Sequence, residues 1–508
     1  MSYDAQAALS PWDEHNRHLA ANVHPADWQN PTPTGRYHLV VIGAGTAGLV
    51  TAAGAAGLGA KVALVEKHLM GGDCLNVGCV PSKALLRSAH AIAHIAQAKN
   101  LGVHLHGEPT VDFPAVMERV RRIRSGISHH DSAKRFRDLG VDVFLGEGKF
   151  LGDDTVEVGG QKLRYKKAVI TTGARAAVPD IPGLKEAGFL TNETVFNLAE
   201  LPARMAVLGG GPIGCELAQA FQRLGTQVTI LHKHSRLMPH DDAEAAAIVQ
   251  ASLLLDGVQV VTDAEVGKVE LNGSSKRISY RHADKASAVE VDVILVATGR
   301  QPNVHGLGLE NVGVAFDERQ GVQVNDFLQT TNPRIYAAGD VCLARKFTHA
   351  ADFAARIVIQ NTLFLGRKKL SALTIPHCTY TEPELAQVGL TETEAKQRGL
   401  KVRAFTQPFA TLDRALTDGT TQGFVKILVP ADSDKIIGAI IVGPHAGDLI
   451  SEISVAMAGG MGLGRLASVI HPYPTLAEAI RKCGDAYNRT RLTPTVKSLF
   501  TKWLEWTR

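Results

Sequence analysis

Two segments of the chain repeat one plan: an apolar strand, a glycine-rich turn, a helix and a second apolar strand. The first spans 37–66 around Gly43-x-Gly45-x-x-Gly48, and the second spans 205–231 around Gly209-x-Gly211-x-x-Gly214. A glycine motif alone is weak evidence, but the flanking strands and helix identify βαβ units that bind a pyrophosphate at the helix N-terminus. The sequence therefore predicts an α/β fold with two Rossmann-like dinucleotide-binding domains.

Each predicted domain also contains an apolar strand that ends in Thr-Gly. In the first domain the Thr-Gly pair is Thr172 and Gly173. In the second domain Gly299 ends the pair, and Arg300 follows it. Glycine at a strand end lets backbone approach a bound molecule closely. We expect these four residues to lie near the nucleotides.

The predicted domain limits follow from changes of pattern. Crossings rich in Pro and Gly indicate that the second nucleotide domain is inserted into the first. After residue 373, alternating strands and helices predict a separate α+β domain. The predicted parts are an N-terminal extension (1–35), the first nucleotide domain (36–180 and 301–372), the second nucleotide domain (181–300), the α+β domain (373–487) and an amphipathic tail (488–508).

Composition restricts the class of protein. The chain has 508 residues, of which 45% are hydrophobic, and it contains no run of eighteen apolar residues. Its first 35 residues lack the apolar segment of a signal peptide, so we expect a soluble, cytoplasmic protein. The net charge of +4 is too small to indicate nucleic acid as a partner.

Two of the six cysteines, Cys74 and Cys79, are closely spaced within GGDCLNVGCVPSK. An ideal helix rises roughly 7.5 Å over five residues, more than the usual Cα separation in a disulfide, so a bond would need a distorted first turn. Gly72 and Gly78 permit such a distortion. A strained disulfide is easily reduced and re-formed, which predicts a catalytic redox pair; the alternative is two unrelated buried thiols.

With these motifs, residues 36 to about 485 resemble the class I pyridine nucleotide-disulfide oxidoreductases, the family of dihydrolipoamide dehydrogenase, glutathione reductase and mercuric reductase. The resemblance implies a homodimer that binds FAD at the first βαβ unit and NAD(P)H at the second. It implies that Glu66 holds the FAD ribose and that Gly339 and Asp340, in IYAAGD, lie near the ribityl phosphate. For Asp340, an ordinary helix cap is the alternative.

The resemblance also implies roles in electron transfer. Hydride passes from NAD(P)H to the flavin, and the reduced flavin reduces the Cys74–Cys79 disulfide. Cys79 is then the thiol on the flavin side and Cys74 the thiol that meets the substrate. Lys83 and Glu216 form a pair beside the flavin; a bare surface ion pair is the alternative.

The choice of nicotinamide cofactor depends on the end of the strand 227–231. A unit that binds NAD carries an acidic residue there, but this chain has His232-Lys233-His234-Ser235-Arg236. Lys233 and its neighbours favour the 2′-phosphate of NADPH. NADH stays the alternative, because basic residues at a strand end can simply be solvated.

The chain departs from the family at its C-terminal motif. Disulfide reductases of the family have His-Pro-Thr-x-x-Glu, whose histidine serves the interchange thiol across the dimer, whereas this chain has Tyr473 at that position and Glu478 at the end. A phenol with pKa near 10 is a poorer proton shuttle than imidazole, so lipoamide or glutathione turnover is disfavoured. Mercuric reductase also has a tyrosine in this region. His471 could act instead; a packed histidine is the alternative.

Two features of mercuric reductase are missing, namely its C-terminal vicinal cysteines and its N-terminal CxxC domain. A pair of thiolates would still bind soft ions such as Hg(II) or Cu(II). His377 and Cys378 could form a second thiol-metal site, but a buried thiol beside an ordinary histidine is the favoured interpretation, as it is for Cys215, Cys342 and Cys483. We predict no resident metal ion.

The tail predicts an amphipathic helix after Pro494, with apolar residues from Leu492 to Trp506 recurring every three or four positions. Residues 481–508 carry seven basic and two acidic side chains. The helix could pack on its own protein or lie on an anionic membrane.

The predicted function is that of an FAD enzyme that passes electrons from NAD(P)H through its disulfide to a thiol-reactive metal ion or a small disulfide. A dihydrolipoamide dehydrogenase is one alternative. A redox sensor or membrane-docked electron-transfer partner is the other.

Overall fold

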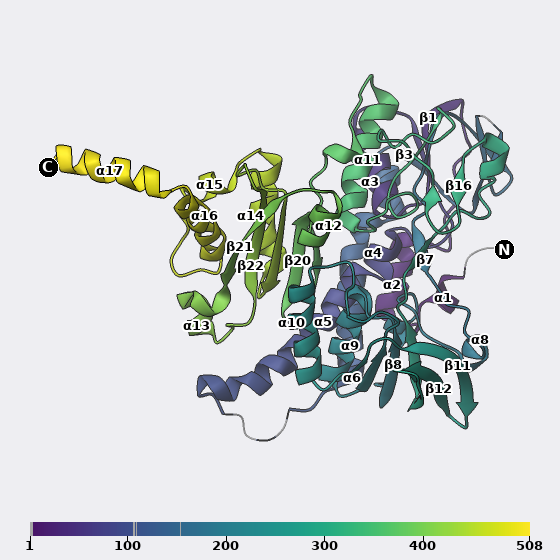
Figure 1. Cartoon of the computed structure of the whole chain (residues 1–508). Coiled ribbons are helices and arrows are strands. Elements are labelled where there is room, and N and C mark those ends of the chain that lie inside the picture. The colour runs from purple at the N-terminus through teal and green to yellow at the C-terminus, as the bar shows by residue number, and fades with distance from the viewer. Residues whose placement is uncertain (1–3, 105–106, 108, 153) are drawn as a thin grey trace. The chain divides into compact units, whose positions relative to one another are not determined.

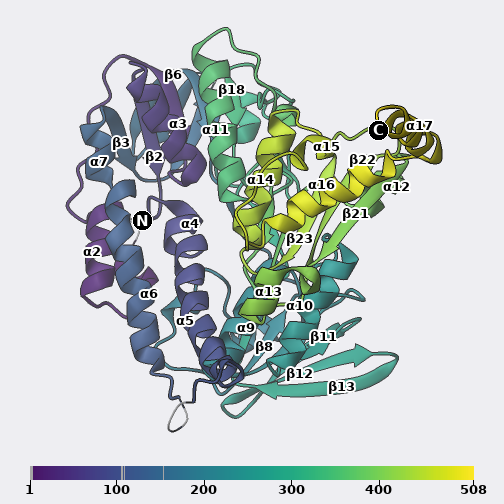
Figure 2. The ribbon, with the colours of Figure 1, turned by 90° about the vertical axis from the view of Figure 1, so that its left-hand side faces the viewer.

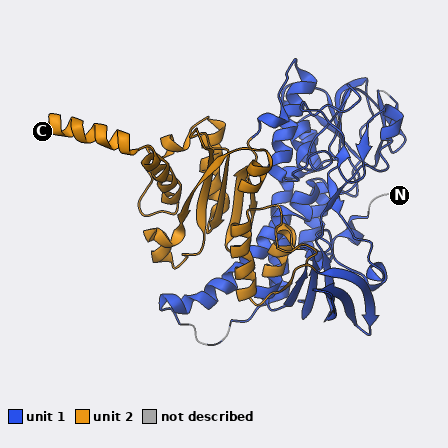
Figure 3. Cartoon of the chain, viewed as in Figure 1, with its two compact units in different colours: residues 1–209, 220–231, 264–373 blue, residues 210–219, 232–263, 374–508 orange. Residues whose placement is uncertain are grey.

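The computed structural model describes residues 4–104, 107, 109–152 and 154–508. Its internal contacts divide the chain into two compact units (Figure 3). Unit 1 comprises residues 1–209, 220–231 and 264–373, and unit 2 comprises residues 210–219, 232–263 and 374–508. The domain limits that the sequence predicts divide the chain differently and stay predictions.

The main sheet of unit 1 carries the first glycine-rich turn. Its strand order is β3-β2-β1-β6-β5-β4, with β18 paired to β6. The last four residues of β1 are buried and form a continuous apolar run, as expected for a parallel strand covered on both faces. These strands are β1 (Arg36–Ile42), β2 (Val62–Glu66), β3 (Val141–Leu145), β4 (Gly148–Gly152), β5 (Thr155–Val158), β6 (Gln161–Ile170) and β18 (Ile335–Ala337).

Helices cover this sheet and carry the cysteines. In unit 1, α3 packs against α11, and α5 runs beside α6 (Figure 1, Figure 2). Two N-terminal helices precede β1, and the second of them packs on α6. The helices are α1 (Ala5–Ala8), α2 (Glu14–Val23), α3 (Thr46–Gly57), α4 (Gly72–Asn76), α5 (Cys79–Gln97), α6 (Phe113–Ile127), α7 (Ala133–Asp138), α8 (Leu184–Ala187) and α11 (Thr348–Leu363).

The second predicted βαβ unit is also present. Its strands form the parallel order β9-β8-β14 within unit 1, and α9 (Pro212–Leu224) follows β8 along the chain. An antiparallel meander and a short ribbon that sequence patterns do not indicate complete this part of unit 1. The strands are β7 (Ala174–Ala176), β8 (Arg204–Leu208), β9 (Gln227–Leu231), β11 (Glu265–Asn272), β12 (Ser275–His282), β13 (Lys285–Val291), β14 (Val293–Val296), β15 (Arg300–Pro302), β16 (Phe316–Asp317) and β17 (Gly321–Val322).

Unit 2 is built on the sheet β19-β20-β23-β22-β21, in which every pair is antiparallel. The helix α14 packs on β20 and β23, and α16 packs on β21 and β22, around one apolar core. This confirms the predicted α+β character. The elements are α10 (Ala243–Leu255), β10 (Gln259–Val261), β19 (His377–Thr379), β20 (Glu384–Gly389), α12 (Glu392–Gln397), β21 (Val402–Pro408), α13 (Asp413–Asp418), β22 (Phe424–Pro430), β23 (Gly438–Gly443), α14 (Ala446–Ala458), α15 (Leu463–Leu466), α16 (Glu478–Thr490) and α17 (Pro494–Trp506).

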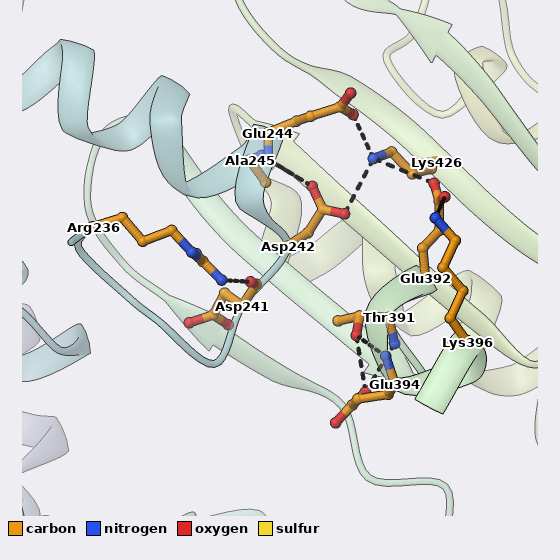
Figure 4. Close-up of polar contacts among 10 residues, drawn as sticks. All are labelled: Arg236, Asp241, Asp242, Glu244, Ala245, Thr391, Glu392, Glu394, Lys396 and Lys426. Atoms are coloured by element: carbon orange, nitrogen blue, oxygen red, sulfur yellow. Dashed lines mark hydrogen bonds and ion pairs between the residues drawn. The ribbon is translucent and has the colours of Figure 1, made fainter. Parts of the chain in front are cut away.

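A buried lysine ties α10 to this sheet within unit 2 (Figure 4). The Lys426 side chain, 5% exposed on β22, donates to Asp242 Oδ2 at 3.1 Å and to Glu244, and it lies 3.9 Å from Glu392 Oε1. The other oxygen of Asp242 accepts from the backbone N–H groups of Glu244 and Ala245, at 3.1 Å each, and so caps α10. Each oxygen of this buried carboxylate therefore has a partner.

The C-terminal helix α17 confirms the predicted amphipathic helix. None of its residues is buried, so the predicted packing on its own chain is not observed among the described residues. In the described part of the chain, no helix is both long enough and apolar enough to cross a membrane.

Candidate active site

The first glycine turn requires glycine at both of its ends. Gly43 has a φ of +105°, and a Cβ on it would lie 2.4 Å from the Thr171 carbonyl oxygen. A Cβ on Gly48 would lie 1.8 Å from the Gly43 carbonyl oxygen. Gly45 caps the N-terminus of α3. Strand, turn and helix thus meet as a nucleotide unit requires, with backbone N–H groups at the helix start.

Glu66 ends β2 and reaches back to this turn. Its Oε2 accepts from the Ala44 N–H at 2.6 Å, and its Oε1 accepts from the His68 N–H at 2.7 Å. Burial raises the pKa of Glu66 above its usual value, and the two N–H groups oppose that rise. The carboxylate is therefore fixed beside the turn; its contact with a ribose stays a prediction.

The second glycine turn repeats this geometry with a different side chain. Gly209 has a φ of +112°, and a Cβ on it would lie 2.4 Å from the Ala297 carbonyl oxygen. His232, directly after β9, accepts from the Gly210 N–H at its Nδ1, at 3.0 Å. Gly211 has open space where a Cβ would lie, and Gly214 is buried in α9. The bond from Gly210 to His232 matches the bond from the second residue of the first turn to Glu66.

The basic run after β9 looks uniform in sequence, but its side chains have different roles in the structure. Burial lowers the pKa of His232 below its usual 6.5, so this ring is neutral at pH 7 and can accept from the turn. Arg236 donates to the carbonyl oxygens of Met238, Pro239 and Asp241 at 2.7 to 2.9 Å. Lys233 is exposed. Of the run, His232 and Arg236 therefore have structural bonds, whereas Lys233 faces solvent.

The two predicted Thr-Gly strand ends have a common design. The Thr172 hydroxyl donates to the Asn303 carbonyl at 2.7 Å, and Gly173 has a φ of +67°. In the second case Thr298 donates to the Ala177 carbonyl at 2.7 Å, and Gly299 has a φ of +145°. Both glycines thus adopt backbone conformations that other residues rarely adopt. Their nucleotide contacts stay predictions.

The two cysteines lie on separate helices, which corrects the expectation of one distorted turn. Cys74 is in α4 and Cys79 begins α5, and the chain breaks at Gly78, where a Cβ would lie 2.7 Å from the Asp73 carbonyl oxygen. No disulfide joins the two cysteines in this structure, so that bond stays a prediction. A hydrogen bond with Cys79, together with burial, raises the pKa of Cys74.

A residue distant in sequence also reaches this pair. The Thr348 hydroxyl, at the start of α11, lies 3.3 Å from Cys79 Sγ. No local sequence pattern indicates it, since 269 residues separate the two. A hydroxyl at this distance can donate a hydrogen bond to a Cys79 thiolate.

Arg300 occupies the centre of a charged cluster beside the cysteines. It donates to Asp73, the neighbour of Cys74, and to the Ala174 carbonyl at 2.6 Å, and its Nε lies 3.4 Å from Asp340 Oδ2. Burial raises the pKa of Asp340, and Arg300 opposes that rise. No helix of the described chain begins at Asp340, so the helix-cap alternative is wrong. Gly339, with a φ of +83°, packs on α3.

Lys83 and Glu216 belong to different units. Lys83 lies on α5, one turn after Cys79. Glu216 lies on α9 with 5% of its surface exposed, and its Oε1 accepts from the Tyr380 N–H at 2.9 Å. The predicted pairing of the two stays a prediction, but Glu216 is a buried residue and not part of a bare surface pair.

The residues of the C-terminal motif each have a partner within unit 2. Tyr473 is 71% exposed, and its hydroxyl donates to Asp413 Oδ2 at 2.7 Å. His471 Nε2 lies 2.8 Å from Glu452 Oε1 in a largely buried setting. Glu478 is buried and lies 3.5 Å from an arginine on its own helix. The hydrogen bond to Asp413 raises the pKa of Tyr473.

Of the thiols predicted to be buried, Cys215 and Cys483 are buried, whereas Cys342 and Cys378 are half-buried. Burial raises the pKa of Cys215 and raises those of Cys342 and Cys483 to about 12. His377 Nε2 lies 2.8 Å from Asp241 Oδ1, an ordinary histidine–carboxylate pair. Within the described ranges, no three His, Cys, Asp or Glu side chains gather as a metal site.

Comparison with known proteins agrees with this arrangement. Residues 37–357 match the model of the pyridine nucleotide-disulphide oxidoreductases, and residues 375–483 match the dimerisation domain of that family. Mercuric reductase from Staphylococcus aureus is 38% identical over 455 residues, which cover 90% of this chain and 83% of that protein. Dihydrolipoyl dehydrogenase from Bacillus subtilis is 35% identical over 465 residues, which cover 87% of this chain and 96% of that protein.

A solved structure supports the same conclusion. The Cu(II) complex of the HOCl-induced flavoprotein disulfide reductase RclA from Escherichia coli superposes with a TM-score of 0.80 at 28% identity, covering 89% of this chain and 100% of that chain. In the first βαβ unit, a Cβ at Gly43 or Gly48 would collide with backbone. This tight turn fits a bound dinucleotide. The chain belongs to the pyridine nucleotide-disulphide oxidoreductase family and is a flavin-dependent enzyme.

Proposed function

We propose that this enzyme binds FAD and NADPH, acts as a homodimer, and passes electrons through Cys74 and Cys79 to a soft metal ion such as Hg(II) or Cu(II). FAD, when bound, carries two electrons from the nicotinamide to the cysteine pair. Cys74 is half-buried and Cys79 is exposed. Thr348 supports a thiolate at Cys79 through its hydroxyl.

The observation that carries this proposal is the bond from Tyr473 to Asp413. This bond raises the pKa of the phenol above its usual value near 10, so Tyr473 is a poor proton donor, and a poor base, at neutral pH. Reduction of a disulfide substrate releases a thiolate that needs a proton donor. A soft cation held by two thiolates needs none: as the cysteines close to a disulfide, their two electrons reduce one Hg(II) to Hg(0), or two Cu(II) to two Cu(I).

A small disulfide is the second candidate substrate, and one contact favours it. His471 and Glu452, 2.8 Å apart, form the imidazole–carboxylate pair of a general base. With His471 as that base, the enzyme would be a dihydrolipoamide dehydrogenase.

The nucleotide assignment rests on the end of β9. A neutral His232 stands where an NAD unit has an acid, and the exposed Lys233 follows it. Neither repels a 2′-phosphate, and Lys233 can pair with it. We therefore assign NADPH, with NADH as the alternative.

The homodimer is supported by the dimerisation-domain match at 375–483. That stretch carries large apolar side chains in solvent, including Ile470 at 93% exposed, together with Val455 and Tyr473. A second copy would remove such surface from water. In this arrangement Tyr473 and Glu478 complete the active site of the partner.

The test is anaerobic reduction with NADPH followed by reoxidation with Hg(II), Cu(II), lipoamide and glutathione disulfide. Cys79→Ser should abolish the long-wavelength charge-transfer band of the reduced enzyme, and Cys74→Ser should retain it. We expect rapid reoxidation by the metal ions only. Fast lipoamide turnover that collapses in His471→Ala would instead establish the dehydrogenase.

A gain-of-function variant tests the role of the tyrosine. Tyr473→His should raise lipoamide turnover and leave flavin reduction by NADPH unchanged, because general acid–base catalysis is typically worth about 10²–10⁴-fold. Unchanged lipoamide turnover in a folded variant would contradict this explanation of substrate choice.

We further propose that α17 contacts an anionic membrane surface. At 3.6 residues per turn, its six large apolar side chains fall within an arc of about 160°. Lys497 and Lys502 flank the two edges of the arc, and Glu505 lies opposite it. The surrounding tail, 481–508, has seven basic and two acidic side chains, which complement anionic lipid. The six apolar side chains are Val496, Leu499, Phe500, Trp503, Leu504 and Trp506.

Co-sedimentation with vesicles tests this contact. The protein should bind phosphatidylglycerol vesicles, release at high salt, and ignore phosphatidylcholine vesicles. Trp503→Ser should lose binding, and Ser498→Ala, on the polar face, should keep it. Absence of binding contradicts the proposal, as does a change of oligomeric state in Trp503→Ser, which would assign the helix to a second copy of the chain.

A further inference from the structure

The N-terminal segment precedes the first family match, which begins at residue 37, yet it belongs to unit 1. Its helix α2 buries Asn16, Leu19 and Val23 completely. No sequence motif in this segment indicates a role. Two of its connections reach the segment 70–76, which contains Cys74.

One contact runs through a buried arginine. Arg124 of α6 is 1% exposed and donates from Nη2 to Asn16 Oδ1 at 2.5 Å and from Nη1 to the Asn76 carbonyl at 2.8 Å. Asn76 is the last residue of α4, two positions after Cys74. The guanidinium therefore bridges α2 to the helix that carries the cysteine.

A second contact holds the other end of the segment. The Met70 N–H donates to the Val23 carbonyl, at the end of α2, at 3.1 Å. The Asn76 side chain closes the segment on itself by donating to the Met70 and Gly72 carbonyls at 3.0 and 2.9 Å. Residues 70 and 76 are thus both connected to α2.

The orientation of Asn16 is fixed by its own partners. Its Nδ2 donates to the Pro11 carbonyl at 2.7 Å, so its Oδ1 is the atom that faces Arg124. Asp13 caps α2 by accepting from the Asn16 N–H at 2.9 Å, and it pairs with Arg121 of α6 at 2.5 Å. The acceptor that Arg124 uses is therefore held through both the side chain and the backbone of Asn16.

We propose that the N-terminal segment is a clamp that positions Cys74 against Cys79, with Asn16 and Arg124 as its positioning residues. Holding one thiol beside the other raises its effective concentration and so favours the disulfide over the dithiol. A loosened clamp makes the disulfide easier to reduce and exposes Cys74. The redox consequence rests on the proposed function; the restraint on Cys74 does not.

The test uses Asn16→Ala in the full-length holoenzyme, with Asn22→Ala as the matched control. Asn22 lies on the same helix and donates to Ser128 at 2.8 Å, away from the segment 70–76. In a glutathione redox buffer, Asn16→Ala should shift the pair three- to tenfold toward the dithiol, where tenfold is about 30 mV for a two-electron couple. Asn22→Ala should match the wild type, and Asn16→Asp, which keeps the acceptor, should restore most of the equilibrium.

A second readout does not require a disulfide. Alkylation of Cys74 in the reduced protein should be several-fold faster in Asn16→Ala than in Asn22→Ala. Equal alkylation rates and equal redox equilibria in a folded, flavin-loaded Asn16→Ala would overturn the clamp. A wild-type pair that never oxidises would contradict the proposed function, and the alkylation rates would still decide on the clamp.

A third readout needs no variant. Because coupling is reciprocal, a clamp that favours the disulfide must itself be tightened by it. Amide hydrogens of residues 14–23 should exchange more slowly in the oxidised wild-type enzyme than in the reduced enzyme. Equal exchange in the two redox states would also overturn the proposal.

Discussion

Replacing His232 with glutamate should reverse the nucleotide preference. In the first βαβ unit Glu66 accepts from the Ala44 N–H at 2.6 Å, and in the second βαβ unit His232 accepts from the equivalent N–H, that of Gly210, at 3.0 Å. His232→Glu keeps this acceptor and adds the charge that an NAD unit uses on the ribose hydroxyls. The two βαβ units would then both have a glutamate carboxylate at the end of the second strand.

The magnitude follows from charge. A carboxylate about 5 Å from a 2′-phosphate, at an effective dielectric constant near 20, costs about 3 kcal/mol for each unit of phosphate charge. That cost lowers kcat/KM for NADPH by roughly 10²-fold or more. With NADH, a charge-assisted hydrogen bond to the ribose adds about 1.5–3 kcal/mol, which is roughly tenfold or more.

The assay is stopped-flow flavin reduction by each nucleotide, with His232→Gln as the control. Gln retains a neutral acceptor for the Gly210 N–H and should keep the NADPH preference. Lys233→Gln should weaken NADPH alone. An equal loss with both nucleotides in His232→Glu, or the same behaviour in His232→Gln, would refute the assignment of this side chain to nucleotide choice.

Three further changes test the described contacts. Lys426→Met strands the buried carboxylate of Asp242 and should destabilise unit 2 by about 2–4 kcal/mol in chemical denaturation, with most of the loss recovered when Asp242→Asn is added. Burial raises the pKa of Asp13, but hydrogen bonds from a backbone N–H and a guanidinium outweigh it and hold the pKa below 3.8. The attachment of α2 is therefore stable above pH 3.8 and is lost as pH falls through the lower pKa that Asp13 has in the folded protein. Limited proteolysis should cut α2 only below about pH 4, and Asp13→Asn should be cut at neutral pH. Asp413→Asn should lower the pKa of Tyr473, which ultraviolet titration of the phenol measures.

The parts of the fold that sequence predicts are those with a local signal. The strand and glycine turn predicted at 37–48 are found there in the structure, because their spacing and apolar runs specify them. The meander β11-β12-β13 gives no such signal: β13 is exposed at most positions, so no apolar alternation marks it. Sheet pairing there comes from neighbouring strands and not from a buried face.

The candidate site divides in the same way. The cysteines, the glycines and Glu66 are recognisable from spacing. Thr348 and Asn16 are not, because each acts on a residue roughly a hundred or more positions away, and such contacts are absent from any local pattern. The structural role of Arg236 is hidden for another reason: its partners are backbone carbonyls, which every residue has.

The raised pKa values of Cys215, Cys342 and Cys483 protect these thiols from reaction with electrophiles. A thiol whose pKa lies far above neutrality has almost no thiolate, and the thiolate is the form that alkylating agents, peroxides and mercurials attack. Attack is therefore directed to Cys79, the exposed thiol, where under the proposed function electrons from the nicotinamide cofactor can repair the reversible lesions. The exposed thiol of the chain thus lies where the enzyme can also restore it.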